Sequence, residues 1–325
     1  MPLHDLPSYA ANRRICLPRI SGVFGLPWVE GDDKANAATF NEAFVGPEHG
    51  ILNIPVTQVQ LDAARGDLVA LGFAEPHLPA LGTFGNTYGL GAVNPANARR
   101  SRLVRDMEAD GYDLGDLYLL TGQRRLEKRD GDPMELLAGI NRDVLAHPWV
   151  ERHIAGRPWE KNWSVTEFHV WVGIELAIEP ALELEECVYF QAGTDTLLPD
   201  VPRRHFQEVR LRRPNGKLVV VNNAPAIERW DSLGKPADPR HTTISCTLDL
   251  LARHPELLQT GADELYISGN PHAERMVDDS RRALTERGRR PSLHLAATSL
   301  PSTHERFVQL SLHELGMREH NAYLL

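Results

Sequence analysis

The sequence predicts an α/β fold in which a mainly parallel sheet is covered by helices on both faces. Three observations support this expectation. Short apolar runs alternate with amphipathic helical segments from Asp113 onward, which is typical of β–α units. Several of these helical segments begin directly after a strand, as they do in crossover connections of parallel sheets. The chain of 325 residues is also long enough to bury a large core.

Five strands and five helices are expected in this part of the chain. The strands span 116–120, 187–191, 218–221, 264–267 and 293–296, and the helices span 134–145, 165–178, 244–254, 271–287 and 303–315. The last two helices have clear start signals, because Asn270 precedes a proline and Ser302 to Glu305 fit the S-x-x-E capping box. We therefore expect a Rossmann-like ligand-binding domain over 111–325, with ligands at the carboxyl ends of its strands.

Residues 1–110 read as a less regular N-terminal extension or lid region. Only 56–71 has helical periodicity, and 81–95 contains four glycines and is expected to form a long loop that closes over the cleft. Gly89-Leu90-Gly91 resembles half of a dinucleotide fingerprint. We assign it no role, because no strand is expected before it and no third glycine follows at the required position.

Composition limits the class of partner. A formal net charge of -9 argues against binding to nucleic acid or to anionic membranes, which needs a basic face. The three cysteines form no C-x-x-C pair, and no apolar run approaches the roughly 18 residues of a membrane span. We expect a soluble, cytoplasmic protein whose partner is a small anionic ligand, and we leave a homo-oligomer open.

The first segment suited to an anion is Thr121 to Arg125, directly after the strand 116–120. Gly122 provides a turn, and Gln123, Arg124 and Arg125 provide donors at the carboxyl end of a strand. This pattern suits a phosphate or a carboxylate, although a turn glycine beside solvated arginines is an equal alternative. The segment lacks the G-x-x-x-x-G-K-[ST] spacing of a P-loop.

A second segment surrounds the start of the helix at 271–287. His272 and Arg275 are three residues apart, so they share one face beside unpaired backbone N–H groups, where an anion is favoured. Ser268 and Asn270, in the preceding turn, are expected to contact the ligand as well. In the alternative interpretation, His272 caps or packs and Arg275 pairs with Asp278 or Asp279.

A third segment, Arg240 to Ser245, opens the helix at 244–254. Arg240 supplies a cation, and the hydroxyls of Thr242 and Thr243 either bind ligand oxygens or only cap the helix. No metal site is expected, because no H-x-x-x-H or H-E-x-x-H pair lies on a predicted helix.

The order of these segments resembles the YdcF-like family, which includes SanA-type and ElyC-type proteins. Leu119 to Arg124 is similar to its first strand end and Thr166-Glu167-Phe168 to its S-E-A helix start. Arg240 to Ser245 is similar to its n-T-x-e-N segment, and Ile267 to Arg275 to its T-s-x-H-x-x-R segment. The resemblance implies a Rossmann-like sheet with a polar cleft and a nucleotide-like ligand such as S-adenosylmethionine.

The favoured hypothesis is an enzyme acting on a small phosphorylated or nucleotide-like substrate, either as a hydrolase or as a transferase. Arg124, Arg240 and Arg275 would bind the anion, His272 would be the general acid or base, and Glu167 would orient His272 or act as the base. Two alternatives stay open. One is a non-catalytic metabolite- or nucleotide-binding module, and the other is an interaction protein that oligomerises through its N-terminal third.

Overall fold

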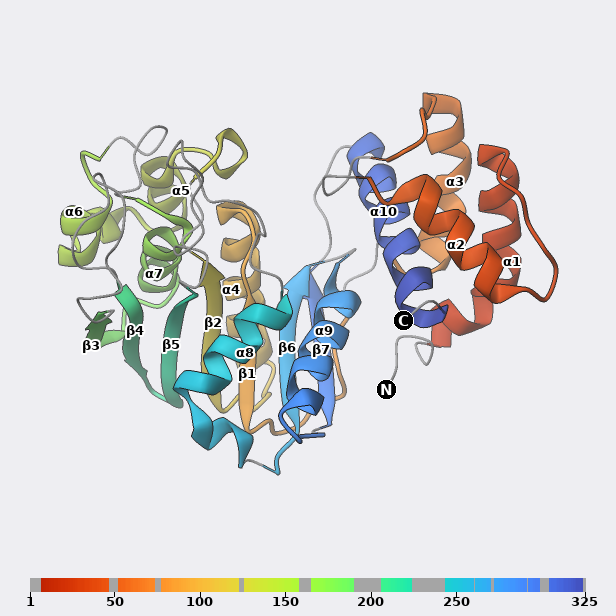
Figure 1. The fold of residues 1–325 in the computed structure, drawn as a ribbon. Coiled ribbons are helices and arrows are strands. Elements are labelled where there is room, and N and C mark those ends of the chain that lie inside the picture. Colours follow the sequence, from red (N-terminus) through yellow and green to blue (C-terminus); the bar gives the residue numbers. More distant parts are fainter. Residues whose placement is uncertain are drawn as a thin grey trace, which may run out of the picture. The chain divides into compact units, whose positions relative to one another are not determined.

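The computed structural model describes residues 7–46, 52–73, 77–122, 126–157, 165–189, 206–223, 243–259, 261–269, 272–290, 292–298 and 304–323. Internal contacts divide the chain into two compact units (Figure 1). The helical unit comprises Met1–Leu78, Gly269–Asp278 and Leu295–Leu325, and the sheet unit comprises Pro79–Ser268 and Asp279–His294.

The sheet has seven strands in the order β3-β4-β5-β2-β1-β6-β7. Their bounds are β1 Asn86–Leu90, β2 Asp116–Gly122, β3 Glu183–Tyr189, β4 Phe206–Arg213, β5 Gly216–Asn223, β6 Glu264–Gly269 and β7 Leu293–Thr298. β1 pairs in parallel with β2 and β6, and β2 pairs in parallel with β5. β4 is antiparallel to both β3 and β5. The sheet is thus mixed but mostly parallel, which confirms the predicted fold class.

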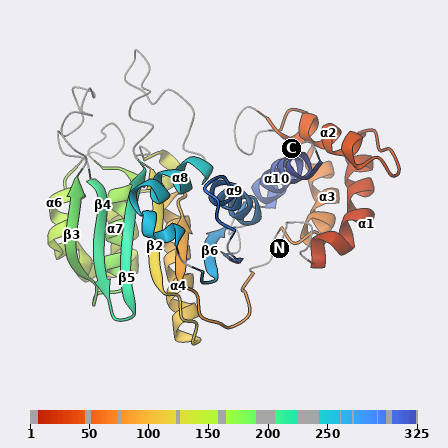
Figure 2. The same cartoon turned by 60° about the horizontal axis from the view of Figure 1, so that its bottom comes forward.

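Helices cover both faces of this sheet (Figures 1 and 2). One face carries α4 (Asn94–Ala109), α5 (Pro133–Ile140), α6 (Pro148–His153) and α7 (Glu167–Ile178), and the other carries α8 (Thr243–Arg253) and α9 (Ala273–Glu286). Short 3-10 turns connect them at η2 (Lys128–Asp130), η3 (Arg142–Ala146) and η5 (Pro255–Leu258). α7 is apolar on nearly all sides and almost wholly buried, as expected of a helix enclosed by the sheet and other helices.

The strand order reverses direction beside β1. After β1 the chain forms β2, β3, β4 and β5 on one side of β1, and it then forms β6 and β7 on the other side. The junction between β1 and β6 is therefore a topological switch point of a Rossmann-like sheet. Ligands of open α/β sheets bind outside the carboxyl ends of the strands at such a point.

β1 corrects two expectations about 81–95. The segment contains a fully buried central strand rather than one long loop, so residues 86–90 cannot act as a lid. Contacts of Tyr88 stabilise this strand. Its ring stacks on those of Tyr118 and Tyr266, with centroid distances of 5.7 Å and 4.8 Å, and its hydroxyl donates to Glu264 Oε1 at 3.0 Å. β1 also ends directly before Gly91, contrary to the expectation that no strand precedes Gly89-Leu90-Gly91.

The helical unit packs α1 (Pro7–Phe24), α2 (Asp33–Phe44) and α3 (Gln58–Ala70) with α10 (His304–Tyr323) around a common apolar core. The helix predicted at 56–71 is confirmed as α3, which begins with a Thr57 capping box. Gly316 in α10 allows close approach of α2, because a Cβ there would lie 2.9 Å from the carbonyl oxygen of Phe40. The compact units therefore do not follow the division expected at residue 110. No helix within the described ranges is long and apolar enough to cross a membrane.

Candidate functional site

The carboxyl ends of four neighbouring strands meet at one edge of the sheet. β1 and β2 are in register at Leu90 and Leu120, and Gly122 at the end of β2 pairs with Asn223 of β5. Ser268 lies near the end of β6 and is fully buried. Two residues expected to contact ligand, Gly122 and Ser268, thus lie along the same edge, as their positions after strands predicted.

Glu167 projects toward the carboxyl end of β1. It is the first residue of α7, and its side chain is buried. Asn97 Nδ2 donates to Glu167 Oε1 at 3.2 Å. Gly91, directly after β1, leaves room for this carboxylate: a Cβ there would lie 2.6 Å from Glu167 Oε1 and 2.8 Å from the carbonyl oxygen of Leu120. Glycine at 91 is therefore needed for Glu167 to reach the end of β1.

Arg100 partly balances the charge of Glu167. It is buried in α4 and donates from Nη1 to the carbonyl of Leu90. Burial lowers the pKa of Arg100 to about 10, while the nearby Glu167 raises this pKa and Arg99 lowers it. Arg100 nevertheless stays protonated at neutral pH, so Glu167 faces a fixed positive charge.

Three backbone N–H groups at the start of α4, those of Gly91, Ala92 and Asn94, are already bonded within the protein. Gly91 N donates to the Leu120 carbonyl at 2.8 Å, and Ala92 N donates to Asn97 Oδ1 at 2.9 Å. Asn94 N donates to Oδ1 of Asp130 at 3.1 Å, and Asp130 is fully buried. Carbonyl, amide and carboxylate oxygens of the chain therefore occupy the donors that a phosphate would use at a helix start.

The Asn94 side chain is the exception at this helix start. It is fully buried, and neither Oδ1 nor Nδ2 has a hydrogen-bond partner in the part of the chain that the structure describes. A buried polar atom without a partner costs about 1–3 kcal/mol. Asn94, Asn97, Asp130 and Glu167 together are called the α4 polar group below.

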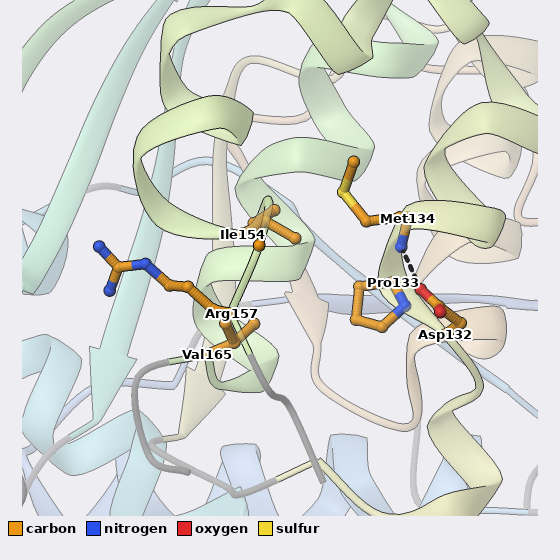
Figure 3. A pocket seen from close by; sticks show the side chains of 7 residues that line it. Asp132, Pro133, Met134, Ile154, Arg157 and Val165 are labelled. Atoms are coloured by element: carbon orange, nitrogen blue, oxygen red, sulfur yellow. Dashed lines mark hydrogen bonds between the residues drawn. The ribbon is translucent and has the colours of Figure 1, made fainter.

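A pocket of about 460 Å³ lies between α5, α6 and the start of α7 (Figure 3). Its lining is partly polar and partly apolar and consists of Asp132, Pro133, Met134, Ile154, Gly156, Arg157 and Val165. Asp132 Oδ1 accepts from Met134 N at 2.8 Å and so caps α5. The Arg157 guanidinium points away from the pocket (Figure 3) and donates to the Arg152 carbonyl at 2.7 Å. Along the chain, Asp132 and Val165 are each two residues from a member of the α4 polar group.

His272 and Arg275 lie in the helical unit, and both contact Glu314 of α10. Glu314 Oε2 is 2.8 Å from His272 Nδ1, and Arg275 Nε donates to Glu314 Oε1 at 2.9 Å. His272 N also donates to the carbonyl of Gly269, the last residue of β6, at 3.1 Å. Burial acts to raise the pKa of Glu314, but Arg275, His272 and Arg318 outweigh burial and hold this pKa far below its usual range.

Glu314 is a residue that the sequence analysis missed. It occupies the position at His272 Nδ1 that was expected for Glu167, and Glu167 belongs to the sheet unit. Arg275 also contacts Glu314, a partner that the sequence does not indicate beside the expected alternatives Asp278 and Asp279. Nothing in the sequence links Glu314 to His272, because His272 precedes α9 and Glu314 lies in α10, 42 residues further along the chain.

Of the remaining residues expected at the site, the structure describes only Thr243. Thr243 begins α8 and is largely buried, and its carbonyl accepts from Thr247 Oγ1 at 2.8 Å. Gln123, Arg124, Arg125, Arg240, Thr242 and Asn270 lie outside the described residues. Among the residues that the structure does describe, no group of three or more His, Cys, Asp or Glu side chains could hold a metal ion.

Comparison with known proteins gives no relative for this chain: no protein-family model, no curated protein and no solved structure matches it. The resemblance to YdcF-like proteins therefore depends on the short motifs alone.

Proposed function

We propose that this chain is an enzyme that acts on a small phosphorylated or nucleotide-like substrate at the carboxyl edge of its sheet. The observation that carries the proposal is the placement of Glu167, a buried carboxylate held by Asn97 at the end of β1. β1 borders the switch point with β6, where open α/β sheets bind their ligands. The YdcF-like motifs agree with a nucleotide-like ligand such as S-adenosylmethionine.

In this proposal Glu167 takes or donates the proton of the reaction. A carboxylate within hydrogen-bond reach of a bound substrate acts as a general base when ionised and as a general acid when protonated. The guanidinium of Arg100 lies near Glu167, and we therefore assign Glu167 the role of the base. The anion of the substrate then has to be bound by groups other than the start of α4, whose donors are occupied.

A binding module without turnover is the second candidate. The observation that favours it is the fixed positive charge of Arg100 near Glu167, because a carboxylate held by Asn97 beside this charge can accept hydrogen bonds from a ligand without any proton transfer.

A thermal-shift screen with nucleotides, sugar phosphates and S-adenosylmethionine tests the proposal. A ligand at 100 times its dissociation constant stabilises the protein by about 2.7 kcal/mol. Bound ligands are then incubated with the protein and with Glu167→Gln, and products are followed by NMR. Turnover by the wild type that Glu167→Gln lacks supports the enzyme. Binding without turnover supports the binding module, and no binding by any of the three ligand classes refutes both.

A further inference from the structure

We infer that the α4 polar group binds a neutral, hydroxyl-bearing part of the ligand, such as a sugar diol, and not its phosphate. This inference deepens the proposed function and rests on it for the position of the ligand. Three properties of the group support it: its occupied N–H donors, its balanced charges and the unpaired amide of Asn94.

The occupied donors exclude the usual way of binding a phosphate. Helix N-termini attract anions because several backbone N–H groups point outward without partners. Here the N–H groups of Gly91, Ala92 and Asn94 donate to oxygens of Leu120, Asn97 and Asp130. Pro95 has no N–H group, and Ala96 and Asn97 donate to the Val93 carbonyl. A phosphate would have to displace these acceptors, one of which is a buried carboxylate.

The charges around the α4 polar group also favour a neutral ligand group over a phosphate. Glu167 and Asp130 are both buried, and Arg100 lies close enough to Glu167 to change its own pKa. Arg99 is near Arg100 in turn. Two carboxylates are thus set against two guanidinium groups, so the group carries no excess positive charge to hold a phosphate dianion beside the carboxylates. A neutral ligand group meets no such repulsion.

The side-chain amide of Asn94 has one donor group and one acceptor atom without partners, so a suitable ligand group both donates and accepts hydrogen bonds. Its Oδ1 and Nδ2 are unpaired within the described residues, whereas Asn97 in the same turn bonds to Ala92 N, Ala92 O and Glu167. A hydroxyl donates one hydrogen bond and accepts up to two. Vicinal hydroxyls can therefore donate to an ionised carboxylate and accept from an amide, which is the combination that the α4 polar group offers.

The neighbouring pocket provides room for the rest of such a ligand. Its volume of about 460 Å³ falls within the range of small-molecule sites, and its lining combines apolar residues such as Pro133, Met134 and Ile154 with polar surface (Figure 3). Asp132 follows Asp130 by two residues and Val165 precedes Glu167 by two, so the pocket lining and the α4 polar group draw on the same two stretches of the chain. A group that carries both apolar and polar atoms, joined to a sugar, fits this lining.

The test uses Asn94→Leu, which is close in size to asparagine and removes only unpaired polar atoms. Adenosine and ribose are the neutral probes, inorganic phosphate is the anionic probe, and Asn94→Ala is a second variant in case leucine perturbs packing. Calorimetric titration should show that adenosine or ribose binds the wild type and that both variants weaken this binding about ten- to hundredfold. Phosphate binding, where it occurs, should be unchanged.

The outcomes separate this inference from the proposed function. Neutral probes that fail to bind the wild type, or bind both variants as tightly as the wild type, overturn the inference. A loss of phosphate binding in Asn94→Leu overturns it as well. If sugar phosphates are bound and converted while Asn94→Leu is without effect, the proposed function stands and the inference falls. If neutral probes bind through Asn94 and no substrate is converted, the inference stands and the enzyme proposal falls.

Discussion

Glu314→Gln should weaken the helical unit strongly. Glu314 is fully buried and contacts His272 at 2.8 Å and Arg275 at 2.9 Å, so one carboxylate joins the start of α9 to α10. Glutamine keeps the shape and one acceptor oxygen but removes the negative charge. The largely buried Arg275 then loses its counter-charge at this position.

The expected loss is about 3 kcal/mol, the lower end of the range for removing one partner of a buried ion pair. That value corresponds to a change of roughly a hundredfold in the folding equilibrium. Glu42→Gln is the matched control, because Glu42 is an exposed carboxylate of α2 in the same unit. An exposed substitution of this kind typically changes stability by less than about 0.5 kcal/mol.

The effect should depend on pH in a defined direction. The pKa of Glu314 is depressed in the folded protein, so its contribution is complete above the ordinary carboxyl pKa of 4.5 and is lost as pH falls toward the folded value. The stability difference between wild type and Glu314→Gln should therefore be largest near pH 7 and should narrow below about pH 5.

Urea unfolding followed by circular dichroism, at several pH values between 7 and 3, measures this difference. Because the chain has two units, hydrogen exchange of peptides from α9 and α10 should accompany it to report on the helical unit itself. Equal midpoints and equal exchange for wild type and Glu314→Gln at pH 7 would refute the stabilising role of this ion cluster.

Two further predictions concern glycines. Gly316→Ala should destabilise the helical unit by about 1–3 kcal/mol in urea unfolding, because the new Cβ would lie 2.9 Å from a backbone oxygen of α2. Gly66→Ala in α3 is its control: a Cβ there meets nothing within 4 Å, so a gain of about 0.4–1 kcal/mol is expected, and equal effects of the two substitutions would contradict the packing described. Gly91→Ala should displace Glu167 and abolish the thermal shift of any ligand that the wild type binds, and an unchanged shift would place the ligand elsewhere.

The sheet was predictable where its strands are apolar. β5 contains the buried run Leu218 to Val221, and β6 contains the buried residues Leu265, Tyr266 and Ile267; apolar runs of this kind are recognisable from sequence alone. β1, with the sequence N-T-Y-G-L, was not recognised, because its stability comes from partners far along the chain. Thr87 donates to the Leu114 carbonyl at 2.7 Å, and Tyr88 stacks between the rings of two other strands.

The candidate site was predictable only to the level of the sheet edge. Glycine and polar residues directly after strands indicated Gly122 and Ser268, since parallel strands end at a common edge. The α4 polar group was missed except for Glu167, because Asn97 and Glu167 are 70 residues apart and meet only in the folded sheet unit. Periodicity and local motifs carry no information on such pairings.

The position of α10 in the chain affects how the protein matures. α1, α2 and α3 are synthesised first, but their apolar faces share a core with α10, which follows all seven strands. During synthesis, part of the apolar surface of these three helices therefore stays exposed until α10 has left the ribosome. The sheet unit, whose first six strands are contiguous in sequence, is expected to fold earlier. Exposed apolar helices are aggregation-prone during such a delay, so expression at lower temperature or with added chaperones should raise the yield of folded protein.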